Sequence, residues 1–358
     1  MTTILRNIVQ QFLIKGELKN IFPYGSGHIN DTYKVETDQK NYLLQRINHT
    51  VFKNVEGLTR NLIAISEFLR HNLHRESGNM QLLKSIPTKE KLYITQDHKR
   101  NYWRIFDFVE ESRGYDRVEN PEIAFEGGKT YGWFVRMLSD FPVSQLVETI
   151  PHFHSAKFRI GNFKKAVMAG SAGRVAEVKL LIDYLMERSS SMMHIFELAK
   201  EGRIPLRVTH NDTKINNVLF DTQNRGICVI DMDTVMPGYV HFDFGDAIRT
   251  FANSADEDEK DLGKVSVNMK YFEAFTRGFL SQTNDILIPE EVDSLAFSAK
   301  YITYEQTIRF LTDYLEGDRY YKVKYPQHNL IRSKAQAKLL MSMEAHFPQM
   351  EDVIKKNT

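Results

Sequence analysis

Four polar residues that together could transfer a phosphoryl group lie in two neighbouring stretches of this chain. The first stretch is V-T-H-N-D-T-K-I-N-N-V-L-F, residues 208–220, and the second is C-V-I-D-M-D, residues 228–233. Phosphoryl transfer needs one carboxylate to position or deprotonate the attacking hydroxyl, and an amide and a second carboxylate to hold magnesium against nucleotide phosphates. We therefore expect Asp212 and Lys214 to be catalytic, and Asn217 and Asp231 to bind Mg²⁺.

The spacing of this first stretch matches a known catalytic loop. His210, Asp212 and Asn217 fit the pattern H-R-D-x-x-x-x-N of kinases, with Asn211 in the place of the arginine. The apolar runs V-L-F and I-C-V-I predict two short strands that would place Asn217 and Asp231 side by side. Alone, the spacing also fits a turn that caps a helix. The strand ending at Asp231 and the run F-D-F-G-D-A-I-R after it favour a kinase.

A glycine-containing turn, Y-G-S-G-H-I-N, lies between two predicted strands near the N-terminus. The glycines of a dinucleotide-binding fold open a helix instead, so this placement argues against that fold. It suits a flap whose backbone N–H groups cover nucleotide phosphates, or else an ordinary hairpin turn. We assign Gly25, Ser26 and Gly27 to nucleotide binding, and we expect His28 and Asn30 to reach phosphate or substrate.

One position departs from the kinase pattern. Kinases carry a lysine on the third strand that pairs the α- and β-phosphates with a helix glutamate, but in Y-L-L-Q-R-I the matching residue is Gln45. Neither Glu56 nor Glu67 of the next helix is a compelling partner. A glutamine can donate hydrogen bonds to a phosphate but brings no charge. The phosphates would then be neutralised by magnesium, Lys214 and backbone donors, or the nucleotide would bind weakly.

The order of predicted elements gives an α+β, protein-kinase-like fold, with an N-terminal sheet lobe and a larger, mainly helical C-terminal lobe. We place the nucleotide-binding lobe, a five-stranded sheet plus a helix, at residues 1–110, and the helical lobe with the catalytic loop at 111–358. Apolar periodicity predicts the helices. Their ranges are 1–19, 55–73, 121–139, 142–154, 173–201, 265–283, 289–317 and 331–346.

Composition narrows the possible partners of the protein and the compartment in which it works. The 358 residues carry a net charge of +1, so no global field attracts nucleic acid or a membrane. The one cysteine, Cys228, lies in an apolar run, which excludes an intramolecular disulfide and favours a small buried side chain. No apolar run approaches a membrane span, and the N-terminus does not resemble a signal peptide. We expect a cytoplasmic monomer.

The longer motifs resemble a known family. The His210–Asp231 pattern is similar to the aminoglycoside phosphotransferase and choline kinase group of small-molecule kinases. Within it, the motifs resemble those of N-acetylhexosamine 1-kinases from about residue 20 to about residue 346, and that group also carries glutamine at the third-strand position. These motifs are Y-G-S-G-H-I-N, Y-L-L-Q-R, E-T-I-P-H-F-H, R-V-T-H-N-D-T-K-I-N-N, I-D-M-D-T-V-M-P-G, F-D-F-G-D-A-I-R and R-F-L-T-D-Y-L-E-G-D.

The resemblance implies ATP- and Mg²⁺-dependent phosphorylation of the anomeric hydroxyl of N-acetylglucosamine or N-acetylgalactosamine. It implies that Asp212 is the base, and that Asn217 and Asp231 hold magnesium. It also implies that adenine binds the connector, the short segment that joins the two lobes. The implied sugar contacts are Arg309, Tyr320 and His28, and the connector residues are Phe108, Val109 and Glu110. Asp233 is expected to add a water-mediated metal contact or to bind a sugar hydroxyl.

Other interpretations stay open at this point. A kinase of the same fold could act on an amino alcohol, homoserine or another hexose, and the acids Asp313, Glu316 and Asp318 could attract a cationic acceptor. A catalytically silent nucleotide-binding protein would explain the missing lysine, although the base and both metal ligands are present. Several other polar and aromatic residues are expected to be structural, namely His152, His154, Asp243, Asp246, Arg249, Trp103 and Trp133. The acidic run 255–261 is expected to be a solvated loop and the start of a helix.

Overall fold

The computed structural model describes residues 2–25, 29–73 and 79–358. Contacts divide the chain into two compact units. Unit 1 comprises Met1–Gly114, Asp140–Pro151 and Val218–Pro237, and unit 2 comprises Tyr115–Ser139, His152–Asn217 and Gly238–Thr358. The segments 140–151 and 218–237, which we had assigned to the C-terminal lobe, therefore cluster with the N-terminal residues.

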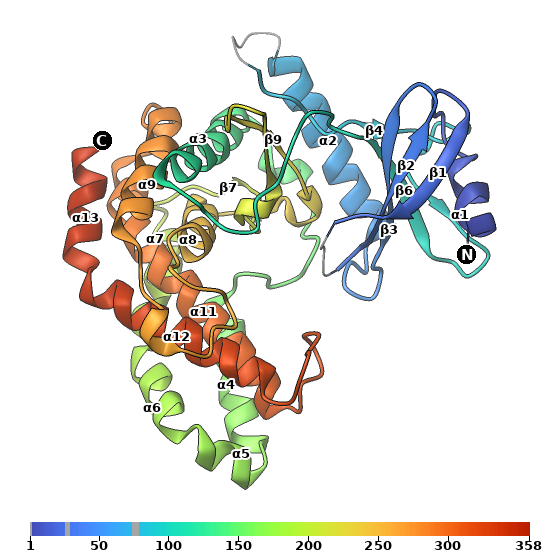
Figure 1. Cartoon of the computed structure of the whole chain (residues 1–358). Coiled ribbons are helices and arrows are strands. Elements are labelled where there is room, and N and C mark those ends of the chain that lie inside the picture. The colour runs from blue at the N-terminus through green and yellow to red at the C-terminus, as the bar shows by residue number, and fades with distance from the viewer. Residues whose placement is uncertain (1, 26–28, 74–78) are drawn as a thin grey trace. The chain divides into compact units, whose positions relative to one another are not determined.

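Unit 1 contains an antiparallel sheet in the order β1-β2-β3-β6-β4, with β5 also paired to β6 (Figure 1). The predicted hairpin, the third strand and the strand predicted over 101–109 are present, whereas of the strand predicted over 91–95 only Thr95 lies in a strand, β5. The described residues add a sixth strand, β4, which at two residues is too short to show periodicity. The strands are β1 (Leu18–Pro23), β2 (Asp31–Thr37), β3 (Asn41–Ile47), β4 (Ser85–Ile86), β5 (Thr95–Gln96) and β6 (Tyr102–Asp107).

Two helices cover parts of this sheet. The N-terminal helix α1 (Thr2–Val9) is shorter than the predicted 1–19, and its apolar side chains join the core formed by β2, β3 and β6. The longer helix α2 (Val55–Leu73) agrees with the prediction, and Val55 and Leu58 pack against Ile47 of β3. Burial of these apolar faces holds the sheet in a fixed register, because a slip by one residue would turn each strand's core face outward.

The remaining part of unit 1 is an antiparallel hairpin of β8 (Val218–Phe220) and β9 (Gly226–Val229), followed by the short 3₁₀ helix η4 (Met232–Thr234). The predicted helix 142–154 is wrong, because only the 3₁₀ turn η1 (Val143–Gln145) forms there. Buried Asn61 accepts from the backbone N–H of Val147 and donates to its carbonyl, at 3.1 and 2.8 Å. These tertiary bonds replace the helical hydrogen bonds that periodicity suggested.

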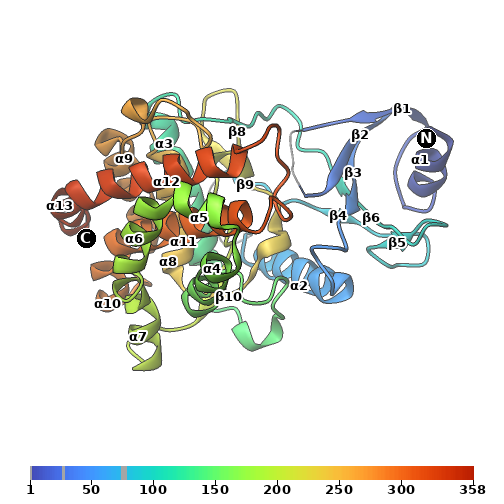
Figure 2. The same cartoon turned by 90° about the horizontal axis from the view of Figure 1, so that it is seen from below.

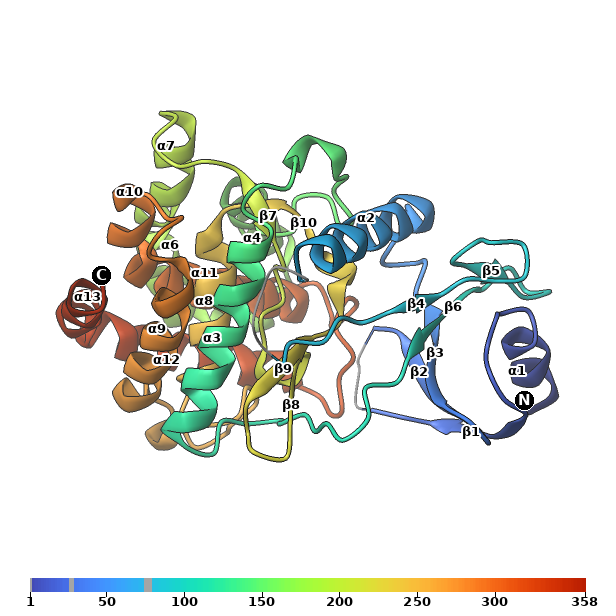
Figure 3. The ribbon, with the colours of Figure 1, turned by 90° about the horizontal axis from the view of Figure 1, so that it is seen from above.

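Unit 2 is mainly helical. The most extensive packing between two of its helices joins α3 to α9, which lie side by side in Figures 1 and 3. A Cβ atom on Gly128 or Gly132 of α3 would lie 2.2 or 2.5 Å from a backbone carbonyl of α9, so only glycine permits this approach. The helices are α3 (Pro121–Met137), α4 (Ala156–Ala169), α5 (Ala172–Glu177), α6 (Lys179–Arg188), α7 (His194–Lys200), α8 (Val240–Phe251), α9 (Met269–Thr283), α10 (Pro289–Asp293), α11 (Leu295–Leu315), α12 (His328–Ala345) and α13 (Phe347–Lys356).

Helix α11 is the centre of unit 2 and packs against α4, α8 and α12. The single helix predicted over 173–201 is instead a series of shorter pieces, α5, α6, η2 (Ser191–Met193) and α7, which Figure 2 shows beside the α11 and α12 pair. Three consecutive serines, residues 189–191, interrupt it. None of the helices in the described ranges combines the length and apolar character of a membrane span.

Candidate active site

The catalytic loop of unit 2 runs from β7 (Arg207–Thr209) to the 3₁₀ helix η3 (Ile215–Asn217). Asp212 and Lys214 form an ion pair there, with 2.7 Å between the carboxylate Oδ1 and Nζ. Burial pushes the pKa of Asp212 upward, but the Lys214 charge and hydrogen bond outweigh burial and hold this pKa below its ordinary value. Burial acts against the Lys214 charge, yet Asp212 raises the pKa of the ammonium. Both groups are therefore charged at neutral pH.

Asn217 is oriented by the same carboxylate. Its side-chain amide donates to the Asp212 carbonyl at 2.8 Å and to Asp212 Oδ2 at 3.2 Å. The amide oxygen is consequently turned away from Asp212. An oxygen of this kind suits magnesium, which is usually bound through one or two carboxylates together with substrate phosphates and water. The described residues contain no group of three or more His, Cys, Asp or Glu side chains arranged for a metal, and such a nucleotide-assisted site does not need one.

Asp243 of α8 binds the backbone of the predicted catalytic loop. Its carboxylate accepts from the backbone N–H groups of His210 and Asn211 at 2.9 and 2.7 Å, which confirms its expected structural role. Complete burial raises the pKa of Asp243 to about 6, although His210 and the two N–H donors oppose the rise.

Asp246 and Arg249, which were also expected to be structural, form an ion pair within α8. Arg249 binds Asp246 at 2.8 Å, and it also binds Glu257 at 2.9 Å. Glu257 lies in the loop that we expected to be solvated, and its side chain is 38% exposed although the buried Arg249 guanidinium anchors it.

The predicted residues of the second metal position and the flap lie in unit 1. Asp231 follows β9 with φ 58° and ψ 53°, in the left-handed region, which aspartate tolerates better than most residues. Its side chain is exposed. Gly25 also has a positive φ, of 78°, with open space around its α-carbon, as a flap or hairpin turn requires. Ser26, Gly27 and His28 lie outside the described residues.

Gln45 belongs to a buried polar network that sequence reasoning missed. Its side-chain oxygen accepts two hydrogen bonds from Arg104, its partner on β6, at 3.0 and 2.8 Å. Arg104 in turn pairs with both carboxylate oxygens of Asp233, at 2.6 and 2.8 Å. Asn30 donates to the same carboxylate at 2.7 Å.

This network changes the expectations for two residues. The side chain of Asp233 is 2% exposed, and Arg104 and Asn30 occupy its oxygens. In this structure Asp233 and Asn30 are therefore engaged with protein groups rather than open to a sugar or a metal. The one sequence signal was an arginine at an inward position of the strand Y-W-R-I-F-D.

In the connector, several of the groups that we expected to bind adenine are engaged within the protein. The N–H of Phe108 donates to the Asn41 carbonyl at 3.2 Å, and the carbonyl of Val109 accepts from Ser112 at 2.7 Å. Glu110 accepts from the Asn41 side chain at 2.8 Å. The Phe108 ring lies edge-on to Tyr24, with their centroids 5.5 Å apart.

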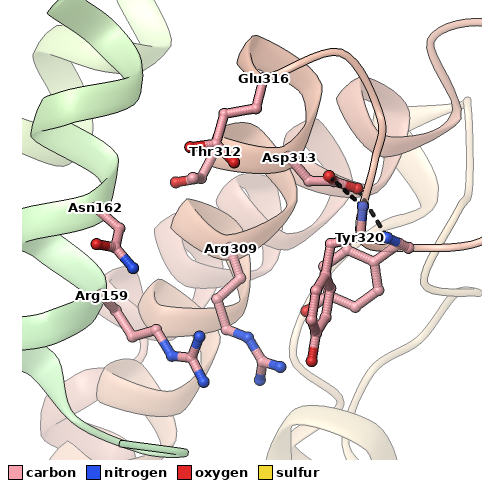
Figure 4. Close-up of a pocket in the computed structure, with 8 residues that line it drawn as sticks. Arg159, Asn162, Arg309, Thr312, Asp313, Glu316 and Tyr320 are labelled. Carbon is pink, nitrogen blue, oxygen red and sulfur yellow. Dashed lines mark hydrogen bonds between the residues drawn. The ribbon is translucent and has the colours of Figure 1, made fainter. Parts of the chain in front are cut away.

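A cavity of about 140 Å³ in unit 2 brings Arg309 and Tyr320 together, as the resemblance implied. Figure 4 shows the guanidinium groups of Arg159, from α4, and Arg309, from α11, entering the same space. Arg159 was not predicted, and no motif marked it. The cavity is lined by Arg159, Asn162, Arg309, Thr312, Asp313, Glu316, Tyr320 and Tyr321.

The acids of this region are mostly committed to the fold. Asp313 is 3% exposed and accepts from the backbone N–H groups of residues 319, 320 and 321 at 2.7–2.9 Å, so it anchors the turn that carries Tyr320 (Figure 4). Asp318 binds Arg174 and Asn329. Glu316 is the lining acid whose side chain stays exposed.

Behind the two arginines lies a buried chain that leads to the catalytic loop. Glu305 faces Arg159 at 3.6 Å and Arg309 at 3.9 Å through Oε1, and it faces His154 Nδ1 at 2.8 Å through Oε2. His154 Nε2 lies 3.0 Å from the carbonyl oxygen of Asn211. His154 was expected to be structural, and its burial, at 7% exposure, agrees with that.

The remaining expected core residues are buried. Trp103 and Trp133 are 4% and 5% exposed. Cys228 is fully buried, and burial raises the pKa of its thiol to about 12, so it is the inert apolar side chain that we predicted.

Comparison with known proteins defines the class. The model of the APH family, described as a phosphotransferase enzyme family, matches residues 21–265, more than half of the chain. The protein therefore belongs to this family, and the predicted α+β, kinase-like fold is confirmed.

Three solved structures show the same fold. A microcompartment-associated aminopropanol kinase is 15% identical with a TM-score of 0.62, covering 98% of this chain and 99% of its own. An aminoglycoside phosphotransferase from Alicyclobacillus acidocaldarius is 12% identical with a TM-score of 0.63, covering 98% and 96%. A spectinomycin phosphotransferase, solved with ADP and spectinomycin, is 13% identical with a TM-score of 0.60, covering 98% and 99%.

Proposed function

We propose that this phosphotransferase uses ATP and Mg²⁺ to phosphorylate the anomeric hydroxyl of an N-acetylhexosamine, giving the sugar 1-phosphate. The observation that carries the proposal is the pair of arginines, Arg159 and Arg309, in the cavity of unit 2. Burial and the Arg309 charge lower the pKa of Arg159, which reflects how closely the two cations are held. Guanidinium groups donate hydrogen bonds and accept none. Hydroxyl and acetamide oxygens suit such a site, whereas a cationic amino alcohol is repelled by it.

The alternative acceptor is an amino alcohol, as in the aminopropanol kinase of the same fold. A cationic acceptor needs an available carboxylate or an aromatic cage. Asp313 and Asp318 already accept from protein donors. The Tyr321 ring already faces the Arg309 guanidinium at 5.8 Å, which leaves Glu316 and the Tyr320 ring for a cation. This disposition favours an uncharged, oxygen-rich acceptor.

The chain's own residues support a simple mechanism. Asp212, ionised at neutral pH through Lys214, accepts the hydrogen bond of the acceptor hydroxyl and takes its proton as the phosphoryl group transfers. Lys214 adds positive charge beside the attacking oxygen. Asn217 and Asp231 are the proposed ligands of Mg²⁺, which when bound would neutralise charge on the nucleotide phosphates. The nucleotide is proposed to bind at the flap, Gln45 and the connector.

The test is ADP release with ATP and magnesium against a panel of acceptors, followed by detection of phosphate at the anomeric carbon. The panel holds N-acetylglucosamine, N-acetylgalactosamine, glucose, galactose, choline, aminopropanol and homoserine. We expect turnover of the N-acetylated sugars, a raised KM in Arg309→Met, and little change in Glu316→Gln. Turnover confined to an amino alcohol and lost in Glu316→Gln would overturn the proposal.

A further inference from the structure

The peptide bond between Asn211 and Asp212 is held from both sides. The N–H of Asp212 donates to His210 Nδ1 at 3.3 Å, and the carbonyl of Asn211 lies 3.0 Å from His154 Nε2. Asn211 has φ 66°, in the left-handed region that is uncommon outside glycine. A peptide in this conformation persists when its surroundings over-determine it. Any rotation of this peptide would move the backbone that carries the proposed base.

His154 is itself oriented by a carboxylate. A backbone carbonyl and an ionised carboxylate can only accept, so both ring nitrogens of His154 are placed as donors, one to Asn211 and one to Glu305. Glu305 is ionised, because His154 and the two arginines hold its pKa below the ordinary value against the effect of burial. Both side chains are nearly inaccessible, at 5% and 2% exposure.

We infer that His154 and Glu305 are positioning residues that couple the arginine-lined cavity to the catalytic loop. Glu305 faces the two guanidinium groups through one oxygen, at 3.6 and 3.9 Å, and bonds His154 through the other, while His154 bonds the Asn211 carbonyl. The inference rests on the proposed function only in taking the cavity as the acceptor site. The same chain of contacts therefore links the position of the two acceptor-binding arginines to the position of the base.

Two substitutions at His154 separate its two hydrogen bonds. The amide nitrogen of asparagine falls near the position of Nδ1, so His154→Asn keeps a donor towards Glu305 and loses the donor to Asn211. The longer glutamine places its nitrogen near Nε2, so His154→Gln keeps the donor to Asn211 and loses that to Glu305. Each variant buries one amide and removes one hydrogen bond, and the bond lost in His154→Gln is the one to the ionised Glu305, so any loss of stability should be larger in His154→Gln.

The first measurement compares steady-state kinetics of the two variants with wild type, with N-acetylglucosamine as acceptor. We expect His154→Asn to lower kcat by roughly 10–100-fold with the acceptor KM nearly unchanged, since small displacements of a catalytic group have effects of this size. His154→Gln should retain most of kcat. A merely structural role would affect both variants, and His154→Gln at least as much, so equal kcat values or a larger loss in His154→Gln would overturn the inference.

A second measurement does not depend on the acceptor. Hydrogen–deuterium exchange of the peptide containing Asp212 should be faster in His154→Asn than in His154→Gln or wild type, because the Asn211 carbonyl is no longer held. Equal exchange in the two variants would also overturn the inference. If wild type turns over no N-acetylhexosamine while exchange separates the variants, the proposed function fails and the positioning role stands.

Discussion

The pairing of Arg104 with Asp233 predicts a large and specific loss of stability in Arg104→Met. The two side chains are 4% and 2% exposed, and removing the arginine leaves a carboxylate buried without its partner. Loss of one member of a buried pair costs about 3–5 kcal/mol of unfolding free energy. The bond from Asn30 to the carboxylate remains, whereas Gln45 loses both of its bonds from Arg104, so we expect a loss within that range. Arg104→Met with Asp233→Leu should recover part of the loss, because the unpaired buried carboxylate is gone, while Asn30 and Gln45 still lack their partners.

The same sheet supplies a control. Arg46 of β3 pairs with Asp31 of β2, with side chains 43% and 42% exposed, and Arg46→Met should cost no more than about 1 kcal/mol. The protein has two tryptophans, so a Trp133→Phe background leaves Trp103, next to Arg104 in β6, as the fluorescent reporter. Urea unfolding of each variant in this background gives the comparison. An Arg104→Met variant as stable as Arg46→Met would refute the reasoning.

Three further predictions concern the proposed base, the proposed metal ligand and a buried histidine. Asp212→Asn should lower kcat roughly 10²–10⁴-fold in the ADP-release assay, and near-wild-type turnover would remove Asp212 from the mechanism. Asp231→Ala should abolish the magnesium-dependent part of ATP binding in calorimetry, and unchanged affinity would contradict its role as a ligand. Burial, with the nearby charges of His194 and Arg207, lowers the pKa of His241 to about 3, so its contribution to stability is present above pH 6.5 and is lost as the pH falls. Between pH 6.5 and pH 5 this amounts to about 2 kcal/mol in urea unfolding, and His241→Gln should lack that part of the slope.

The sequence predicted what local spacing encodes. The loop that leads to Asn217, the strand that precedes Asp231 and the amphipathic helix α2 all follow from short-range patterns, and the structure contains each of them. Asp243 and Arg249 could also be assigned structural roles from the run F-D-F-G-D-A-I-R, although Asp243 lies within α8 and does not cap a helix that begins in this run. Element ends were less predictable where tertiary hydrogen bonds compete, as Asn61 does at Val147.

The side-chain pairings that the sequence did not reveal share a different property. Arg104 and Asp233 are 129 positions apart, and His154 and Glu305 are 151 apart. Periodicity in one segment says which side of a strand or helix is buried, but not which charge it meets there. A single buried histidine or arginine is therefore indistinguishable from core in the sequence, and its partner appears only when the fold brings the segments together.

The glutamine at position 45 shows how a partner that is distant in the sequence changes the interpretation of a residue. In the sequence Gln45 looked like the loss of a catalytic lysine. In the structure its carbonyl oxygen accepts two N–H groups of Arg104, whose other donors hold Asp233. A lysine at this position has no acceptor and would set a second cation against a buried guanidinium. The glutamine is therefore what this sheet requires once a cation already stands on β6, and its presence does not argue for a silent enzyme.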